Sequence, residues 1–137
     1  MEDRNFAEKK LIEELSAACE GLTWMSESDY PWQIVSWQGE TKINSEILKG
    51  YYKYAPEIKV LTKTLSSFFE SVIVEQKWHD EIEKLETLRY QNLYRWFNNN
   101  LKDIQVFLVG EIEVDVYILG KSKDNSIIGL STKVIET

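Results

Sequence analysis

The fold is decided by a stretch of nine residues, Glu111-Ile112-Glu113-Val114-Asp115-Val116-Tyr117-Ile118-Leu119, in which polar and apolar side chains alternate. In an extended chain the acidic residues and Tyr117 lie on one side. The apolar residues Ile112, Val114, Val116 and Ile118 lie on the other. A period of two is typical of a strand with one face on a hydrophobic core and one toward water. The stretch therefore predicts a half-buried antiparallel strand.

A second strand is predicted directly after the first. Residues 121–126 are rich in the lysine, serine, aspartate and asparagine typical of turns, and residues 127–135 then carry Ile128, Leu130 and Val134 at even positions. The two strands form a hairpin whose polar face places Lys133 opposite Glu113 or Asp115. We expect the apolar face of this hairpin to pack on a helix.

The helix best suited to that role is predicted over residues 78–100. Asp80, Glu81 and Glu83 stabilise its start by their charge, and the run of three asparagines at 98–100 ends it. Apolar residues recur along it at helical spacing and form one predicted stripe: Trp78, Ile82, Leu85, Leu88 or Arg89, Leu93, Trp96 and Leu101.

A helix is also predicted over residues 4–19, stopped by Gly21. Its apolar stripe consists of Ala7, Leu11, Leu15 and Ala18, widened by Ile12 and Cys19. Cys19 falls on the buried face, where we interpret it as a small core residue.

Shorter elements are expected between these two helices. They are a strand over 33–38, a helix over 44–48 capped by Asn44 or Ser45, a loop with aromatic anchors over 50–56, a brief strand over 58–62 and a helix over 65–72. Helices beside one sheet predict an α+β layered domain spanning residues 1–137.

Length and composition limit the classes of function. The 137 residues suffice for one hydrophobic core, and 43% hydrophobic residues argue against general disorder. The formal net charge of −7 argues against a nucleic-acid binder, which needs a basic face, and favours a basic partner.

The expected location is the cytoplasm. A single cysteine favours a reducing compartment, and the charged residues of the first ten positions are not typical of an export signal. No apolar run approaches the length of a membrane span, so we expect no membrane association.

Sequence patterns of known catalytic sites are absent, and we expect the chain not to be an enzyme and to need no cofactor. One alternative is a metal-assisted hydrolase in which Glu111, Glu113 and Asp115 hold Mg²⁺ or Mn²⁺. These carboxylates would stand about 6.7 Å apart per step on one strand face, which is wide for a single ion. The interpretation that we favour is a solvated outer face of the sheet, partly paired to Lys133. His79, beside a helix start, is interpreted as a surface or capping residue.

Two features have the composition of a protein interface. Glu27 lies in a polar loop with Ser26, between Trp24 on one side and Tyr30 and Trp32 on the other. The last two residues, Glu136 and Thr137, follow an apolar strand, which would fix a carboxylate and a hydroxyl at the surface. Core aromatics around an ordinary turn, and an incidental strand end, are the alternative interpretations.

Three blocks in this sequence resemble the nuclease A inhibitor (NuiA-like) family. They keep the order and spacing of the family, and the resemblance runs from about residue 6 to the end. The blocks are Gly21-Leu22-Thr23-Trp24-Met25-Ser26-Glu27-Ser28-Asp29-Tyr30-Pro31, Gly110-Glu111-Ile112-Glu113-Val114-Asp115-Val116-Tyr117 and Gly129-Leu130-Ser131-Thr132-Lys133-Val134-Ile135-Glu136-Thr137.

The resemblance implies an α-β-α sandwich that binds a sugar-nonspecific, Mg²⁺-dependent endonuclease and blocks its active site. It implies that Glu27 meets an arginine of the nuclease cleft and that Trp78 packs against the rim. The terminus at Thr137 would reach the catalytic metal of the nuclease through water. Two departures stand out: Lys77 replaces the acidic residue that precedes the tryptophan in the family, and residues 41–56 align poorly.

The function predicted from the sequence is therefore one-to-one inhibition of such a nuclease by occlusion with acidic groups. Glu27, Trp78 and Thr137 are its expected contacts, together with Trp24, Ser26 and Glu136. The alternatives are the hydrolase described above and a protein-interaction module that does not inhibit.

Overall fold

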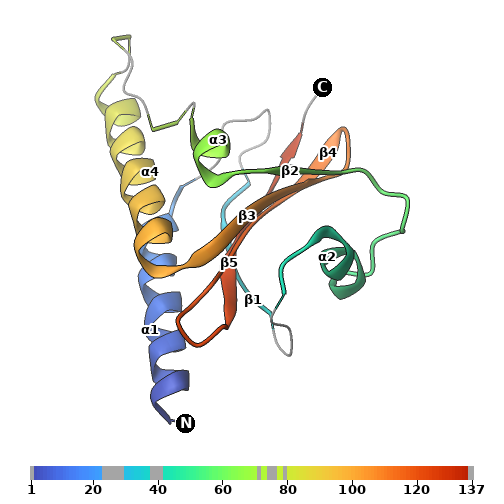
Figure 1. The fold of residues 1–137 in the computed structure, drawn as a ribbon. Coiled ribbons are helices and arrows are strands. Elements are labelled where there is room, and N and C mark those ends of the chain that lie inside the picture. Colours follow the sequence, from blue (N-terminus) through green and yellow to red (C-terminus); the bar gives the residue numbers. More distant parts are fainter. Residues whose placement is uncertain are drawn as a thin grey trace.

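Five strands form one antiparallel sheet in the computed structural model, in the order β1-β5-β4-β3-β2 (Figure 1). The strands are β1 (Gln33–Trp37), β2 (Val60–Lys63), β3 (Lys102–Val109), β4 (Glu113–Lys121) and β5 (Ile127–Ile135). The helices are α1 (Glu2–Cys19), α2 (Ser45–Tyr51), α3 (Leu65–Phe69) and α4 (Glu81–Asn100). The structure describes residues 2–22, 30–37, 42–70, 72–73, 77–78 and 80–135, with side chains from residue 8 onward, and these elements are those of the described residues.

The predicted hairpin is confirmed, and β4 and β5 pair with Asp115 opposite Lys133. β4 nevertheless begins two residues later than predicted, at Glu113, and continues to Lys121. Gly110 has a φ of 109°, and a Cβ there would lie 2.4 Å from the carbonyl oxygen of Glu113. The chain thus turns tightly after β3. Ile112 lies in this turn with 67% of its surface exposed, so its predicted place in the strand is wrong.

The two faces of the sheet carry two hydrophobic clusters. On one face Val114, Val116 and Ile118 pack in a cluster with residues of α1, α3 and α4. On the other face Tyr117 and Leu119 pack in a cluster with Leu48 of α2 and its neighbours. The alternation of β4 is therefore confirmed, whereas the expectation that its second face lies toward water is wrong at Tyr117, which is buried. Helices lie on both faces of an antiparallel sheet, which confirms the α+β class.

The N-terminal helix ends as predicted. α1 stops at Cys19, and Gly21 follows with a φ of 76°, a left-handed conformation that favours glycine. Leu15 is fully buried and Cys19 nearly so. Burial raises the pKa of the Cys19 thiol, which fits its interpretation as a core residue.

The long helix begins later than predicted, because its start is set by a capping box. The side chain of Asp80 accepts from the backbone N–H of Glu83 at 2.8 Å, and the Glu83 side chain accepts from the backbone N–H of Asp80 at 3.3 Å. Both bonds satisfy donors that a helix start leaves unpaired. Trp78 consequently precedes the helix. The predicted end at Asn100 is confirmed.

The apolar stripe of this helix is buried over only part of its length. The buried residues of α4 are Thr87, Tyr90, Leu93 and Phe97. Ile82, Leu85 and Leu88, predicted as stripe residues, are exposed. α1 flanks only the later turns of α4 (Figure 1), where Arg89 donates to the carbonyls of Ala18 and Glu20.

The shorter elements are shifted by a few residues from their predicted bounds. α2 begins after Asn44, whose side chain accepts from the backbone N–H of Ile47 at 2.8 Å, so the asparagine is the cap. The helix continues through Gly50 to Tyr51, two residues that we expected in a loop. α3 ends at Phe69 rather than at residue 72. β1 is confirmed to Trp37, and residue 38 lies outside the described part.

A membrane-spanning helix must be long and apolar. Among the described residues, no helix meets both conditions.

Candidate partner-binding site

Of the six residues predicted to bind a partner, the structure describes Trp78. The others, together with His79, lie outside the described residues: Trp24, Ser26, Glu27, Glu136 and Thr137. Their described neighbours show where the chain enters and leaves each segment.

The structure describes the residues on both sides of 23–29: Leu22 follows α1, and Tyr30 lies beside β5. At its start Leu22 is buried, and its backbone N–H donates to the carbonyl of Cys19 at 3.0 Å. At its end the Thr132 hydroxyl donates to the carbonyl oxygens of Tyr30 and Pro31, at 3.2 and 3.0 Å. Residues 30–31, which follow the segment that carries Glu27, are thus bonded to β5.

The aromatic residues around this segment divide between core and surface. Trp32 is buried, and its Nε1 donates to the hydroxyl of Tyr90 at 3.1 Å. Burial raises the pKa of Tyr90 to about 12. Tyr30 is exposed at its side chain. For Trp32 the alternative interpretation, a core aromatic, is therefore confirmed.

Trp78 is 70% exposed and stands two residues before the N-cap of α4. Figure 1 shows that α4 begins and β5 ends toward the same end of the molecule. The start of the helix that Trp78 precedes and the end of the strand that carries Thr132 therefore lie toward the same end of the fold.

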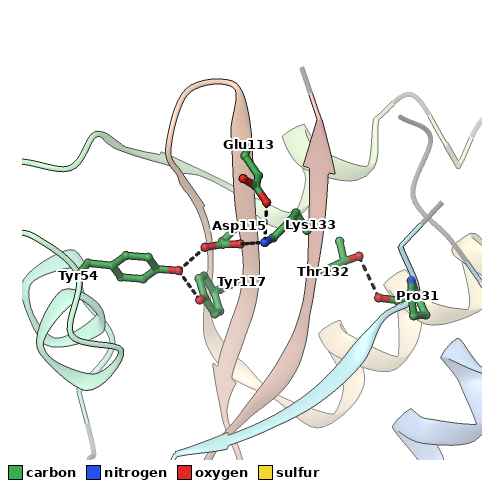
Figure 2. A network of polar contacts seen from close by, with 7 residues as sticks. All are labelled: Pro31, Tyr54, Glu113, Asp115, Tyr117, Thr132 and Lys133. Atoms are coloured by element: carbon green, nitrogen blue, oxygen red, sulfur yellow. Dashed lines mark hydrogen bonds and ion pairs between the residues drawn. The ribbon is translucent and has the colours of Figure 1, made fainter. Parts of the chain in front are cut away.

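The carboxylates of β4 are engaged with a lysine of β5 (Figure 2). Lys133 Nζ lies 2.8 Å from Glu113 Oε1 and 3.9 Å from Asp115 Oδ1. The hydrogen bond that Lys133 donates to Glu113, followed by the charge of Asp115, raises the pKa of Lys133. The prediction that Lys133 lies opposite Glu113 or Asp115 is confirmed, since Asp115 is its partner across the two strands.

These contacts weigh against the hydrolase alternative. Glu111 precedes β4 and is exposed, so it does not continue a ladder with Glu113 and Asp115. The ammonium of Lys133 occupies the space between the other two carboxylates that a cation would need. Within the described ranges no three His, Cys, Asp or Glu side chains are grouped to hold a metal ion.

The polar network extends to a residue that sequence analysis did not select. Tyr54, which follows α2, donates its hydroxyl to Asp115 Oδ2 at 2.6 Å, and the same hydroxyl lies 2.6 Å from that of Tyr117 (Figure 2). The aromatic run at 51–54 was the available signal. Its partners are more than sixty positions away in the sequence, a pairing that only the fold reveals. A hollow of about 420 Å³ lies beside this network, between Tyr30 and Lys133.

The tyrosines of this network predict a loss of stability at alkaline pH. Burial, reinforced by the bonds to Asp115 and Tyr117, raises the pKa of Tyr54, and burial raises that of Tyr117 to about 12. A tyrosine of the unfolded chain ionises near pH 10. The stabilisation is therefore complete below about pH 10 and is lost as the pH rises through about 12.

We expect the free energy of unfolding, measured with urea by tryptophan fluorescence, to fall between pH 9.5 and 12. Tyr54→Phe should be about 1–2 kcal/mol less stable than wild type at pH 7, because the two hydrogen bonds of its partly buried hydroxyl, to Asp115 and Tyr117, are lost. It should also show a shallower alkaline decline. Tyr30→Phe, at an exposed tyrosine, is the matched control. Parallel declines in wild type and Tyr54→Phe would contradict the assignment.

Comparison with models of known protein families identifies one that covers nearly the whole chain. The family model described as nuclease A inhibitor-like protein (NuiA) matches residues 9–137. None of the curated proteins compared matches the chain.

Proposed function

Since the chain belongs to the nuclease A inhibitor-like family, we propose that it binds a sugar-nonspecific, Mg²⁺-dependent endonuclease one-to-one and blocks its active site. The observation that carries this proposal is the extent of the family match. It includes Trp78, the 21–31 block and the residues from Gly110 to the end, and so covers every residue assigned to partner binding. The net charge of −7 supports it, because a cleft that holds phosphates is cationic.

The proposed mechanism is occupation of the phosphate subsites by carboxylates. Glu27 pairs with an arginine of the cleft, since guanidinium binds a carboxylate as it binds a phosphate. The carboxylate of Thr137 reaches the Mg²⁺ of the nuclease through water and offers no bond to cleave. Trp78 packs against the rim, a role that its exposure at the start of α4 supports. Trp24, Ser26 and Glu136 flank these contacts.

In this proposal the chain is an inhibitor and not an enzyme. The metal ion belongs to the nuclease, and the chain needs no cofactor of its own. The carboxylates of β4 have a structural role, because Glu113 and Asp115 hold Lys133 and thereby join β4 to β5 near the end of the sheet.

The proposal is tested by titrating the chain into a purified sugar-nonspecific, Mg²⁺-dependent endonuclease. We expect hydrolysis of duplex DNA and of RNA to fall together and to reach zero at one chain per nuclease, because the occluded cleft serves both substrates. Size-exclusion chromatography should show a 1:1 complex. Full nuclease activity at a tenfold excess of the chain, across a panel of such nucleases, would refute the proposal.

A further inference from the structure

Three apolar side chains of α4 form an exposed band that the proposed function has not used. The exposed fractions are 69% for Ile82, 61% for Leu85 and 48% for Leu88. Residues three apart are neighbours on a helix, so the three lie in a continuous band on one side. The band starts four positions after Trp78, which is itself 70% exposed.

The band is exposed because α1 is too short to cover it. Arg89 donates to the carbonyls of Ala18 and Glu20, and Trp96 Nε1 donates to Glu14 Oε1 at 3.1 Å. These bonds place α1 beside the turns of α4 from Arg89 onward. The first turns of α4 rise beyond the end of α1 (Figure 1). Contiguous exposed apolar residues with a polar border are typical of an interaction surface.

The charges around the band indicate the kind of partner. Residues 80–86 hold four carboxylates and one ammonium, a net charge of −3. Two copies of the chain docked through this band would bring these carboxylates together, which like-charge repulsion disfavours. A basic protein surface with an apolar centre complements both the charge and the exposed side chains. A cleft that binds phosphates supplies the positive charge of such a surface.

We propose that Ile82, Leu85 and Leu88 form, with Trp78, the hydrophobic centre of the surface that docks the rim of the nuclease. This inference rests on the proposed function, whose contacts at Glu27 and Thr137 reach into the cleft. The acidic groups then occupy the active site, and the band of α4 supplies the apolar area that holds the two proteins together.

The test compares inhibition constants of wild type and Ile82→Ser/Leu85→Ser against a purified sugar-nonspecific, Mg²⁺-dependent endonuclease. We expect the double variant to inhibit about tenfold more weakly, with the loss mainly in a faster dissociation rate. Leu61→Ser is the matched control, because it removes an apolar side chain of similar exposure, 50%, from the edge strand β2. Leu85→Glu is a second test variant that retains a good helix former and places a charge within the band.

Each outcome bears on the inference. Equal inhibition by wild type and by both α4 variants, with the nuclease still inhibited, overturns the inference alone. A wild-type dimer that the double variant dissociates, with inhibition unchanged, assigns the band to a second copy and also overturns it. A wild-type chain that leaves the nuclease fully active overturns the proposed function together with the inference.

Discussion

Gly129→Ala is expected to be the most destabilising single methyl addition in the sheet. Gly129 lies in β5 between β1 and β4, opposite Val35 and Leu119. A Cβ at this position would lie 1.7 Å from the carbonyl oxygen of Ile118 and 3.1 Å from the Cα of Leu119. Because the obstacle is backbone, relief requires β4 and β5 to separate. We expect a loss of at least about 3 kcal/mol, the upper end of overpacking costs and a large part of the stability of a domain.

The matched control is Gly50→Ala. Gly50 lies within α2, and a Cβ there meets no atom within 4 Å. Alanine should therefore stabilise the helix by about 0.5–1 kcal/mol. Thermal unfolding followed by circular dichroism should show a large fall in Tm for Gly129→Ala and a small rise for Gly50→Ala. Equal Tm values for Gly129→Ala and wild type would show that the strands tolerate the added methyl group.

The hairpin was predictable because the sequence pattern that determines it lies within two strands adjacent in the chain. Strict alternation assigns each side chain of β4 to a face, and pairing of the two strands then places Lys133 opposite Asp115. What covers each face depends on contacts distant in sequence. The burial of Tyr117 and Leu119 beneath α2 could not be predicted, since the alternation shows which residues share a face and not which helix lies over it.

The long helix shows a different limit. Apolar periodicity correctly groups Ile82 and Leu85 on one side of the helix, but it treats the whole stripe as covered. α1 covers the stripe only from Arg89 onward, where Arg89 donates to the carbonyls of Ala18 and Glu20. The periodicity of one helix does not show how far a second helix extends along it. The error is informative, because apolar residues at helical spacing that remain exposed are candidates for an interface.

The candidate site was predicted by resemblance more than by physical reasoning. Nothing in the residue types alone selects Glu27 from 23 acidic residues or links it to Thr137. The structure contributes the bonds from the Thr132 hydroxyl of β5 to the carbonyls of Tyr30 and Pro31, the residues that follow the 23–29 segment. These two bonds join positions about a hundred residues apart, which a sequence pattern does not reveal.

The largest functional effect is expected from changing both proposed carboxylate contacts. Glu27→Ala should weaken inhibition by about 1.5 kcal/mol or more, the scale of a charge-assisted bond, which is more than tenfold. A Gly-Gly-Ser extension after Thr137 moves the carboxylate away from the nuclease metal and should cost a similar factor. Together they should raise the inhibition constant at least a hundredfold, because the two contacts reach different groups of the cleft. Undiminished inhibition by the doubly altered chain would show that these residues are not the contacts.

A change at Thr132 tests whether its bonds to residues 30–31 position Glu27 for its contact with the nuclease. Thr132→Val keeps the shape of the side chain and removes the hydroxyl that binds the carbonyls of Tyr30 and Pro31. If this anchor positions Glu27, Thr132→Val should weaken inhibition in the wild-type background and add little in the Glu27→Ala background, since the contact it positions is already lost. The extension after Thr137 should remain fully additive with Thr132→Val. Full additivity of Thr132→Val with Glu27→Ala would instead show that the threonine acts on inhibition by another route, while the tenfold effect of Glu27→Ala would stand independently.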